Sequence, residues 1–115
     1  MKKVLIGMLT LFTLVVFGNT ASAQDKDKGA KVFASNGCSM CHSIAGKGNV
    51  KGPLDAVGSK LTPAEIRGWI TDAAGSAAKA KADRKPAMAT MQAKFKGISK
   101  EDLDDLVAYL SSLKK

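Results

Sequence analysis

Cys38-Ser39-Met40-Cys41-His42 decides the fold, because it has the form C-x-x-C-H that attaches a c-type haem to a polypeptide. Two thiols at this spacing can each add to one of the two vinyl groups of the same porphyrin. The histidine that follows is then held beneath the ring, where an imidazole nitrogen can take one axial position on the iron. We therefore expect Cys38 and Cys41 to bind one haem covalently, with His42 as its proximal ligand.

Other interpretations of the same cysteines are weaker. A thioredoxin-like redox pair has the C-x-x-C spacing, but that fold needs alternating strands and helices, and the chain has no strand pattern. A closed zinc site usually needs four ligands, whereas the two cysteines and the one histidine of the chain all lie in this motif. A disulfide between the two cysteines would leave His42 without a role.

The first residues have the organisation of a secretory signal peptide. Residues 1–3 carry positive charge, and residues 19–23 end in an A-x-A cleavage pattern. The apolar run between them, residues 4–17, is shorter than the roughly 20 residues that span a membrane. We expect cleavage after Ala23, export to the periplasm and one domain over residues 24–115; an uncleaved anchor is the alternative. Because haem attachment in bacteria takes place outside the cytoplasmic membrane, the motif and the leader support each other.

The mature chain is expected to be small and basic. The full chain has a formal charge of +8, and Lys2 and Lys3 leave with the leader, so about +6 remains. Such a surface favours redox partner proteins with acidic docking surfaces, although the charge can also serve solubility alone. We expect a monomer with no membrane span after cleavage. We expect no nucleic-acid partner, because an exported protein does not meet nucleic acid. Candidate docking residues are Lys79, Lys81, Arg84 and Lys85.

Apolar spacing and capping residues predict helices separated by loops. The first runs from about residue 27 to residue 36 and ends at Gly37. The second opens at the capping box of Thr62 and Glu65. The last opens at Ser99 and keeps an apolar stripe nearly to the C-terminus. Expected core-facing positions are Gly29, Val32, Phe33, Ile66, Trp69, Ile70, Ala73, Leu103, Leu106, Val107, Leu110 and Leu113.

Two segments between these helices lack a clear apolar pattern. Residues 43–59 are rich in glycine and are expected to wrap over a cofactor edge. Within them, the Pro53 carbonyl is a candidate acceptor for the second ring N–H of His42, although a simple turn at Pro53 is equally compatible with the sequence. Residues 75–85 are rich in alanine and lysine without a wide apolar face, which predicts a basic, solvated segment between two packed parts; a surface helix is the alternative.

Met88 and Met91 are the candidate distal ligands. A thioether is the expected sixth ligand of a low-spin electron carrier, because it is neutral and soft and binds reduced iron well. At most one of the two can bind, and ordinary core packing is the alternative for each. Trp69, the only tryptophan, is expected to pack against the haem or the core rather than to relay electrons.

The order of these elements resembles a class I cytochrome c, the small soluble bacterial monohaem kind, over almost all of residues 24–115. The matching elements are Gly29, Phe33, the C-x-x-C-H motif, Gly52-Pro53-Leu54, the Trp69 helix, a methionine loop and Leu106-Val107-Ala108-Tyr109-Leu110. The resemblance implies an all-α cytochrome c fold, with three to five short helices around one covalent haem. It also implies that the first and last helices cross near Tyr109, and that the Pro53 carbonyl braces His42.

The same resemblance bears on the distal ligand. Relatives often place this methionine just before a proline, at a set distance ahead of the last helix. Met91 has that distance from Ser99, whereas Met88 lies three residues too early. Met91 is followed by Gln92 rather than by proline. We favour Met91 on distance and keep Met88 as the alternative.

The sequence therefore predicts an electron-transfer protein and not an enzyme. With His42 and Met91 both bound, the iron cycles between Fe(II) and Fe(III) without an open site for substrate, and the protein shuttles electrons between periplasmic redox partners. The chain has no further histidine and no paired acid/base loop. The alternatives are a haem enzyme or a gas or redox sensor with an open sixth site, and a cytochrome subunit of a larger oxidoreductase.

Overall fold

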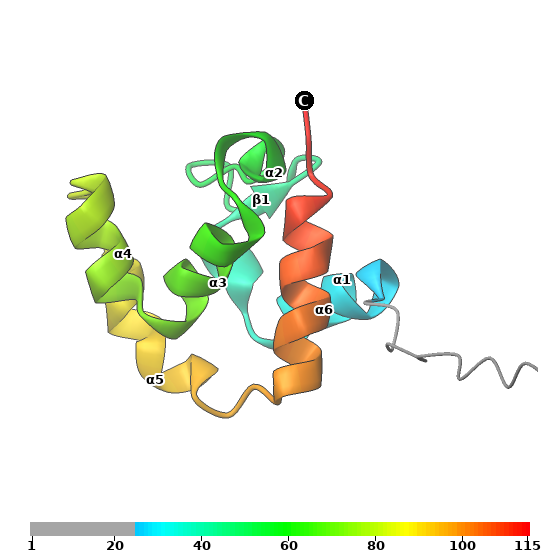
Figure 1. Ribbon diagram of the computed structural model, residues 1–115. Coiled ribbons are helices and arrows are strands. Elements are labelled where there is room, and N and C mark those ends of the chain that lie inside the picture. The colour runs from blue at the N-terminus through cyan, green and yellow to red at the C-terminus, as the bar shows by residue number, and fades with distance from the viewer. Residues whose placement is uncertain (1–24) are drawn as a thin grey trace, which may run out of the picture.

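The computed structural model describes residues 25–115, and the predicted signal peptide lies outside the described residues. The described part is mostly helical, as predicted, and contains six α-helices where three to five are expected. The excess comes from α2 and α5, which have only four residues each. The element order is α1 (Lys26–Ser35), η1 (Cys38–Met40), β1 (Ser43–Ile44), β2 (Lys47–Gly48), α2 (Val57–Lys60), α3 (Pro63–Thr71), α4 (Ala73–Ala80), η2 (Met88–Met91), α5 (Gln92–Phe95) and α6 (Lys100–Ser111) (Figure 1).

The first helix, α1, crosses the last helix, α6, and packs against it (Figure 1). Gly29 lies at the point of contact, where an added Cβ would collide with the backbone of Asp105 and lie 2.6 Å from Cβ of Tyr109. The ring of Phe33 packs edge-on against the ring of Tyr109, with centroids 6.4 Å apart. The close approach therefore requires glycine at position 29, and the crossing implied by the resemblance is confirmed.

The core lies where α1, α3 and α6 meet. Most of the expected core-facing positions are buried there, and each large apolar side chain contributes about 1.5–3 kcal/mol by leaving water. Leu103 and Leu113 pack against this cluster but remain half-buried. Trp69 is half-buried and is not among the core residues. The buried cluster consists of Val32, Phe33, Ile66, Ile70, Leu106, Val107 and Leu110.

The predicted helix starts are confirmed by their capping hydrogen bonds. The Glu65 N–H donates to Oγ1 of Thr62 at 3.2 Å, and the Thr62 N–H donates to Oε2 of Glu65 at 2.7 Å. Ser99 accepts from the Asp102 N–H at 3.1 Å and opens α6 in the same way. Because these side chains satisfy amide groups that a helix leaves unpaired, they fix where each helix begins.

The first half of residues 75–85 belongs to α4, so the surface-helix alternative is correct there, and most of the segment is exposed as predicted. The Asp72 carboxylate accepts from the Gly75 N–H at 3.1 Å and caps this helix. Alanine has the highest helix propensity, so a wide apolar face is not needed for one short helix. The helix ends at Lys81, which adopts a left-handed conformation with φ +52°.

The glycine-rich region contains slightly more regular structure than predicted. β1 and β2 form a two-residue antiparallel ladder, with Ser43 opposite Gly48 and Ile44 opposite Lys47. None of the helices among residues 25–115 has the length and apolar character needed to cross a bilayer.

Candidate haem site

The C-x-x-C-H motif forms one tight turn directly after α1. Gly37 has a positive φ of +70°, which ends α1 and directs the chain into η1. The His42 N–H then donates to the Cys38 carbonyl at 2.9 Å, and the Cys41 N–H donates to the same carbonyl at 3.2 Å. Cys38 and Cys41 are half-buried free thiols, and burial raises the pKa of Cys38. A few local hydrogen bonds thus hold both attachment points beside the histidine.

The imidazole of His42 is oriented by a backbone carbonyl ten residues further along the chain. Its Nδ1 lies 3.0 Å from the carbonyl oxygen of Gly52. The prediction that the Pro53 carbonyl makes this contact is therefore wrong by one residue. The reason is the parallel bridge between Ser43 and Pro53, in which the Ser43 N–H donates to the Gly52 carbonyl at 3.1 Å. That pairing turns the carbonyl of residue 52, not 53, toward the ring.

This contact determines which ring nitrogen is available for a metal. A carbonyl oxygen only accepts, so Nδ1 carries the proton and Nε2 keeps its lone pair. Burial lowers the pKa of His42; the hydrogen bond to Gly52 opposes this effect, and the charge of Arg84 adds to it. The imidazole is thus favoured in the neutral form, which is the form that binds a metal.

Gly52 lies in a space that is too small for any side chain. An added Cβ would collide with the Cys41 carbonyl, and it would lie 2.9 Å from Nη2 of Arg84 and 3.1 Å from Nδ1 of His42. Nη2 of Arg84 also donates a hydrogen bond to the Lys51 carbonyl. The motif, the loop beneath it and the segment that follows α4 therefore converge at this glycine.

Both candidate distal ligands lie on η2. Because side chains three residues apart eclipse on a 3₁₀-helix, Met88 and Met91 project from the same side of this turn. Met88 packs against the hydrophobic core, whereas Met91 is half-buried and is not among the residues of that cluster. Gln92, directly after Met91, hydrogen-bonds to Ile70 and Ala73.

Three residues of this region make contacts that sequence patterns do not predict. They are Gly52, Arg84 and Gln92. Each acts through a contact with residues distant in the chain. A glycine directly before a proline in a loop was the one available signal, since such a pair marks a place where the backbone approaches other groups closely.

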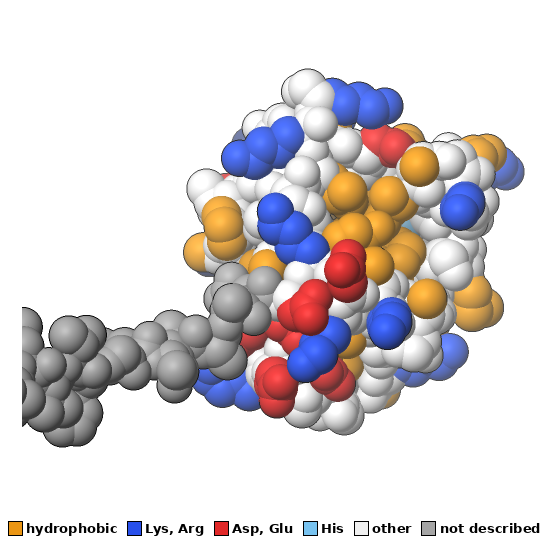
Figure 2. Space-filling view, turned by 90° about the vertical axis from the view of Figure 1, so that its right-hand side faces the viewer, with side chains coloured by type: hydrophobic (Ala, Val, Ile, Leu, Met, Phe, Trp, Pro, Cys, Tyr) orange, Lys and Arg blue, Asp and Glu red, His pale blue; other side chains and the backbone are white. Residues whose placement is uncertain are grey.

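The donor set fits a haem better than a bare ion. Among residues 25–115, no three His, Cys, Asp or Glu side chains come together in a way that could hold a metal ion. A porphyrin supplies four equatorial nitrogens itself and needs only one or two axial ligands from the protein. Apolar side chains gather in the middle of one face, with lysine and arginine on several sides and acidic side chains along its lower border (Figure 2). Half-buried apolar residues next to the core include Cys38, Ile44, Leu54, Leu61, Met88 and Phe95.

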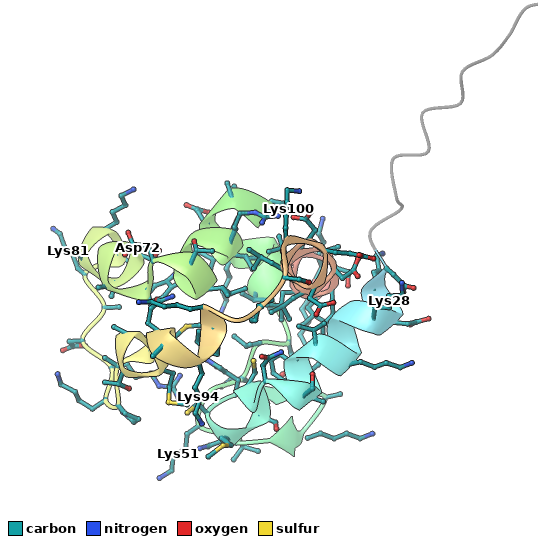
Figure 3. The ribbon with its side chains drawn as sticks, turned by 90° about the horizontal axis from the view of Figure 1, so that it is seen from below. Lys28, Lys51, Asp72, Lys81, Lys94 and Lys100 are labelled. Atoms are coloured by element: carbon teal, nitrogen blue, oxygen red, sulfur yellow. The ribbon has the colours of Figure 1, made fainter. Side chains whose placement is uncertain are left out.

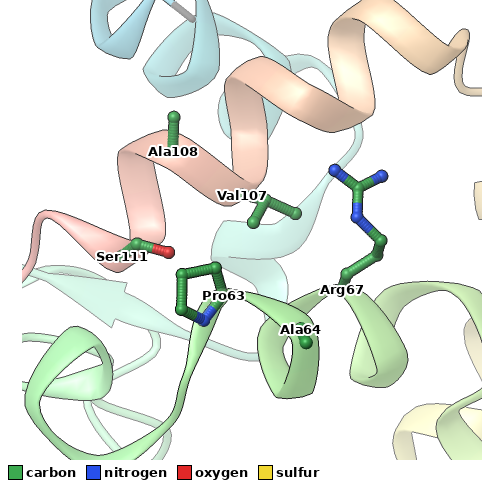
Figure 4. Close-up of a pocket in the computed structure, with 6 residues that line it drawn as sticks. All are labelled: Pro63, Ala64, Arg67, Val107, Ala108 and Ser111. Atoms are coloured by element: carbon green, nitrogen blue, oxygen red, sulfur yellow. The ribbon is translucent and has the colours of Figure 1, made fainter.

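A separate pocket lies between the start of α3 and the second half of α6. Pro63 and Ala64 form one wall, and Val107 and Ala108 form the other, with Arg67 and Ser111 completing the lining (Figure 4). None of the predicted haem-binding residues takes part in it. This pocket is therefore distinct from the Cys38–His42 site.

A mostly helical fold with C-x-x-C-H on a tight turn and a braced imidazole defines a c-type haem protein. The family model described as Cytochrome c matches residues 26–114, and the chain belongs to this family. Comparison with curated proteins and with solved structures gave no significant match. The family binds haem c covalently, and its members are typically electron carriers. The resemblance to a small class I cytochrome c is thereby confirmed.

Proposed function

We propose that this protein is a periplasmic electron carrier with a single haem, attached at Cys38 and Cys41 and ligated by His42 and Met91. The observation that carries the proposal is the 3.0 Å contact between Nδ1 of His42 and the Gly52 carbonyl, which leaves Nε2 as the ligand atom beside two free thiols. One haem follows from one C-x-x-C-H motif in the chain. Periplasmic location rests on the signal-peptide pattern of residues 1–23.

The choice of Met91 over Met88 rests on spacing along the chain. Met91 stands at the distance from α6 that relatives favour, whereas Met88 lies three residues too early. Core packing does not separate the two, because Cys38, an expected attachment point, packs against the same cluster as Met88.

The protein residues hold and tune the site, while the bound haem supplies the Fe(II)/Fe(III) couple. Cys38 and Cys41 fix the ring relative to the chain. The Gly52 carbonyl holds the proton on Nδ1 of His42, which orients the imidazole and strengthens its donation to iron. The Met91 thioether would serve as the second protein ligand of the bound haem and would favour its reduced state. Trp69 is proposed to pack its half-buried ring against the haem.

Charge is distributed unevenly, which suits an acidic redox partner. Residues 79–96 contain six basic side chains and one acidic side chain, whereas residues 101–105, in the first half of α6, contain four acidic side chains and no basic one. Lys51 and Lys94 lie at one edge of the molecule, and Lys28 and Lys100 lie at the α1–α6 end (Figure 3). We propose that the monomer docks through the Lys51–Lys94 edge, with an encounter rate that falls as salt rises.

A mass and a spectrum of the mature protein test the cofactor, the compartment and the ligands together. Expression with a periplasmic haem-attachment system is expected to give a mass equal to residues 24–115 plus one haem. The oxidised protein is expected to show the weak methionine–iron charge-transfer band in the red. A colourless product with free or disulfide-bonded cysteines would overturn the proposal. High-spin iron that binds carbon monoxide at once would favour the open-site alternative.

Substitution of each methionine by leucine separates the two candidate ligands. Met91→Leu is expected to abolish the charge-transfer band and to give high-spin iron. Met88→Leu replaces one apolar side chain by another of similar volume, so it is expected to keep the band and to lower stability by less than about 1.5 kcal/mol. The opposite pattern would assign the ligand to Met88.

A further inference from the structure

The side-chain amide of Gln92 connects the methionine turn to the junction of α3 and α4. Its Nε2 donates to the Ile70 carbonyl at 2.7 Å, and its Oε1 accepts from the Ala73 N–H at 2.9 Å. The partners lie 22 and 19 residues earlier in the chain. Gln92 is half-buried, so both hydrogen bonds are partly shielded from water. One side chain thus ties two segments that are distant in the sequence.

The partners are backbone groups that need an external hydrogen bond. α3 ends at Thr71 and α4 begins at Ala73, with Asp72 between them. The last carbonyls of one helix and the first amides of the next have no partner within their own helix. Gln92 satisfies one group of each kind with a single amide. The amide donates to the free carbonyl at the end of α3 and accepts from the free N–H at the start of α4.

Apart from Gln92, the turn is held by the packing of Met88 against the core and by hydrogen bonds from Thr90 to the Ala87 carbonyl. η2 has four residues, and α5, which follows it, has another four. Helices this short have weak intrinsic stability, because few hydrogen bonds offset the cost of starting a helix. Gln92 is covalently next to Met91, so its amide fixes the backbone from which the thioether projects.

We propose that Gln92 is a positioning residue for the thioether of Met91, acting as a clamp that holds the methionine turn against the α3–α4 junction. The inference rests on the proposed ligation of the haem iron by His42 and Met91. Without the clamp, the turn samples more conformations and the sulfur leaves the iron more often. An added ligand then competes with the thioether more successfully.

Imidazole binding to the oxidised holoprotein tests the clamp, because imidazole takes the position that the thioether vacates. Gln92→Ala removes both hydrogen bonds and is expected to tighten imidazole binding by about five- to tenfold, the factor of roughly one net hydrogen bond. Gln92→Glu keeps the acceptor for Ala73 but turns a second acceptor toward the Ile70 carbonyl, so an effect at least as large as that of Gln92→Ala is expected. Loss of the methionine–iron band reports the displacement in each case.

Thr71→Val is the matched control, because it removes a side-chain hydrogen bond from the same end of α3 without touching Gln92. Oγ1 of Thr71 donates to the Arg67 carbonyl at 2.9 Å and is exposed. Imidazole affinity is expected to stay at the wild-type value in this variant. Amide hydrogen exchange at residues 88–91 is expected to speed up in the Gln92 variants and to stay unchanged in the control.

The outcomes separate this inference from the proposed function. A wild-type protein without the methionine–iron band would overturn both. A wild-type protein with the band, but unchanged imidazole affinity in both Gln92 variants, would overturn the clamp alone. Lower thermal stability with unchanged affinity would make Gln92 a structural residue and would also overturn it. Gln92→Glu keeps the size of the side chain, so it allows the measurement if Gln92→Ala fails to fold.

Discussion

The proximal and distal sides of the haem site are built in different ways. On the proximal side, the turn of residues 37–42 is closed by hydrogen bonds within itself, and His42 is braced by Gly52 only ten residues away. On the distal side, the contacts of Gln92 and Arg84 span 19 to 33 residues. The proximal side can therefore form from one short stretch, whereas the distal side exists only when α3, α4 and the loop at Lys51 are in place.

The largest expected effect comes from breaking the proximal side at Gly52. Gly52→Ala would place a Cβ against the Cys41 carbonyl and the ring of His42, so the loop has to move away from the histidine. We expect the free energy of unfolding to fall by about 1–3 kcal/mol, the usual cost of overpacking. The yield of haem-loaded protein is expected to fall with it. Chemical denaturation of the purified holoprotein measures the first quantity, and absorbance per mole of protein measures the second.

Gly97→Ala provides the comparison for this change. An added Cβ at Gly97 meets nothing within 4 Å, and its φ is not in the left-handed region. The free energy of unfolding of Gly97→Ala is expected to stay close to that of wild type. If Gly52→Ala and Gly97→Ala were equally stable, the close contacts around Gly52 would have no energetic consequence.

The proximal side was largely predictable from sequence, because its functional groups and turn residues lie close together in the chain. The motif supplies three functional groups within five residues, and Gly37, Thr62 and Ser99 mark the helix boundaries through their own backbone and side-chain chemistry. The one error, Pro53 in place of Gly52, is a shift of one residue. It depends on the bridge between the strand at Ser43 and the chain at Pro53, and single-sequence patterns do not specify such a bridge.

The distal side was less predictable for a physical reason. A polar residue such as Gln92 or Arg84 has the same local character whether its side chain faces water or a distant carbonyl. Only the folded arrangement of α3 and α4 shows which backbone groups are left unpaired at their junction. For α4, the sequence left a solvated segment and a surface helix both open; alanine propensity and one cap at Asp72 outweigh the lack of a wide apolar face and favour the helix.

A smaller effect is expected from loosening the other end of the distal segment. Arg84→Gln removes the hydrogen bond from the guanidinium to the Lys51 carbonyl, so residues 84–91 are held only by the core packing of Met88 and by the contacts of Gln92. We expect the local stability of this segment to fall by about 1 kcal/mol. Amide hydrogen exchange over residues 86–91 measures the change. Lys85→Gln removes the same charge from the neighbouring position, and an equal effect there would assign the change to charge alone.

The smallest expected effect concerns the contact between α3 and α6. On the distal side, α3 holds Gln92 through Ile70; on the proximal side, α6 crosses α1, which leads into the turn of the motif. Arg67 on α3 and Lys100 on α6 both contact the carboxylate of Asp104. Hydrogen bonds from Lys100 and Arg67 hold the pKa of Asp104 below its usual value. A lowered carboxyl pKa stabilises the folded state above the ordinary pKa, and this contribution is lost as the pH falls through the lowered value.

Asp104→Asn is therefore expected to reduce thermal stability slightly at neutral pH, and the difference from wild type should vanish in acid. Because the three side chains are partly exposed, water and salt screen the interaction, and the loss should be well below that of Gly52→Ala. Melting curves of both proteins across the acid range measure the convergence, and Asp102→Asn on the same helix serves as the reference. Parallel curves at all pH values would mean that Asp104 acts through its shape and not its charge. In that case, α3 and α6, and with them the two sides of the site, would be held together by apolar packing alone.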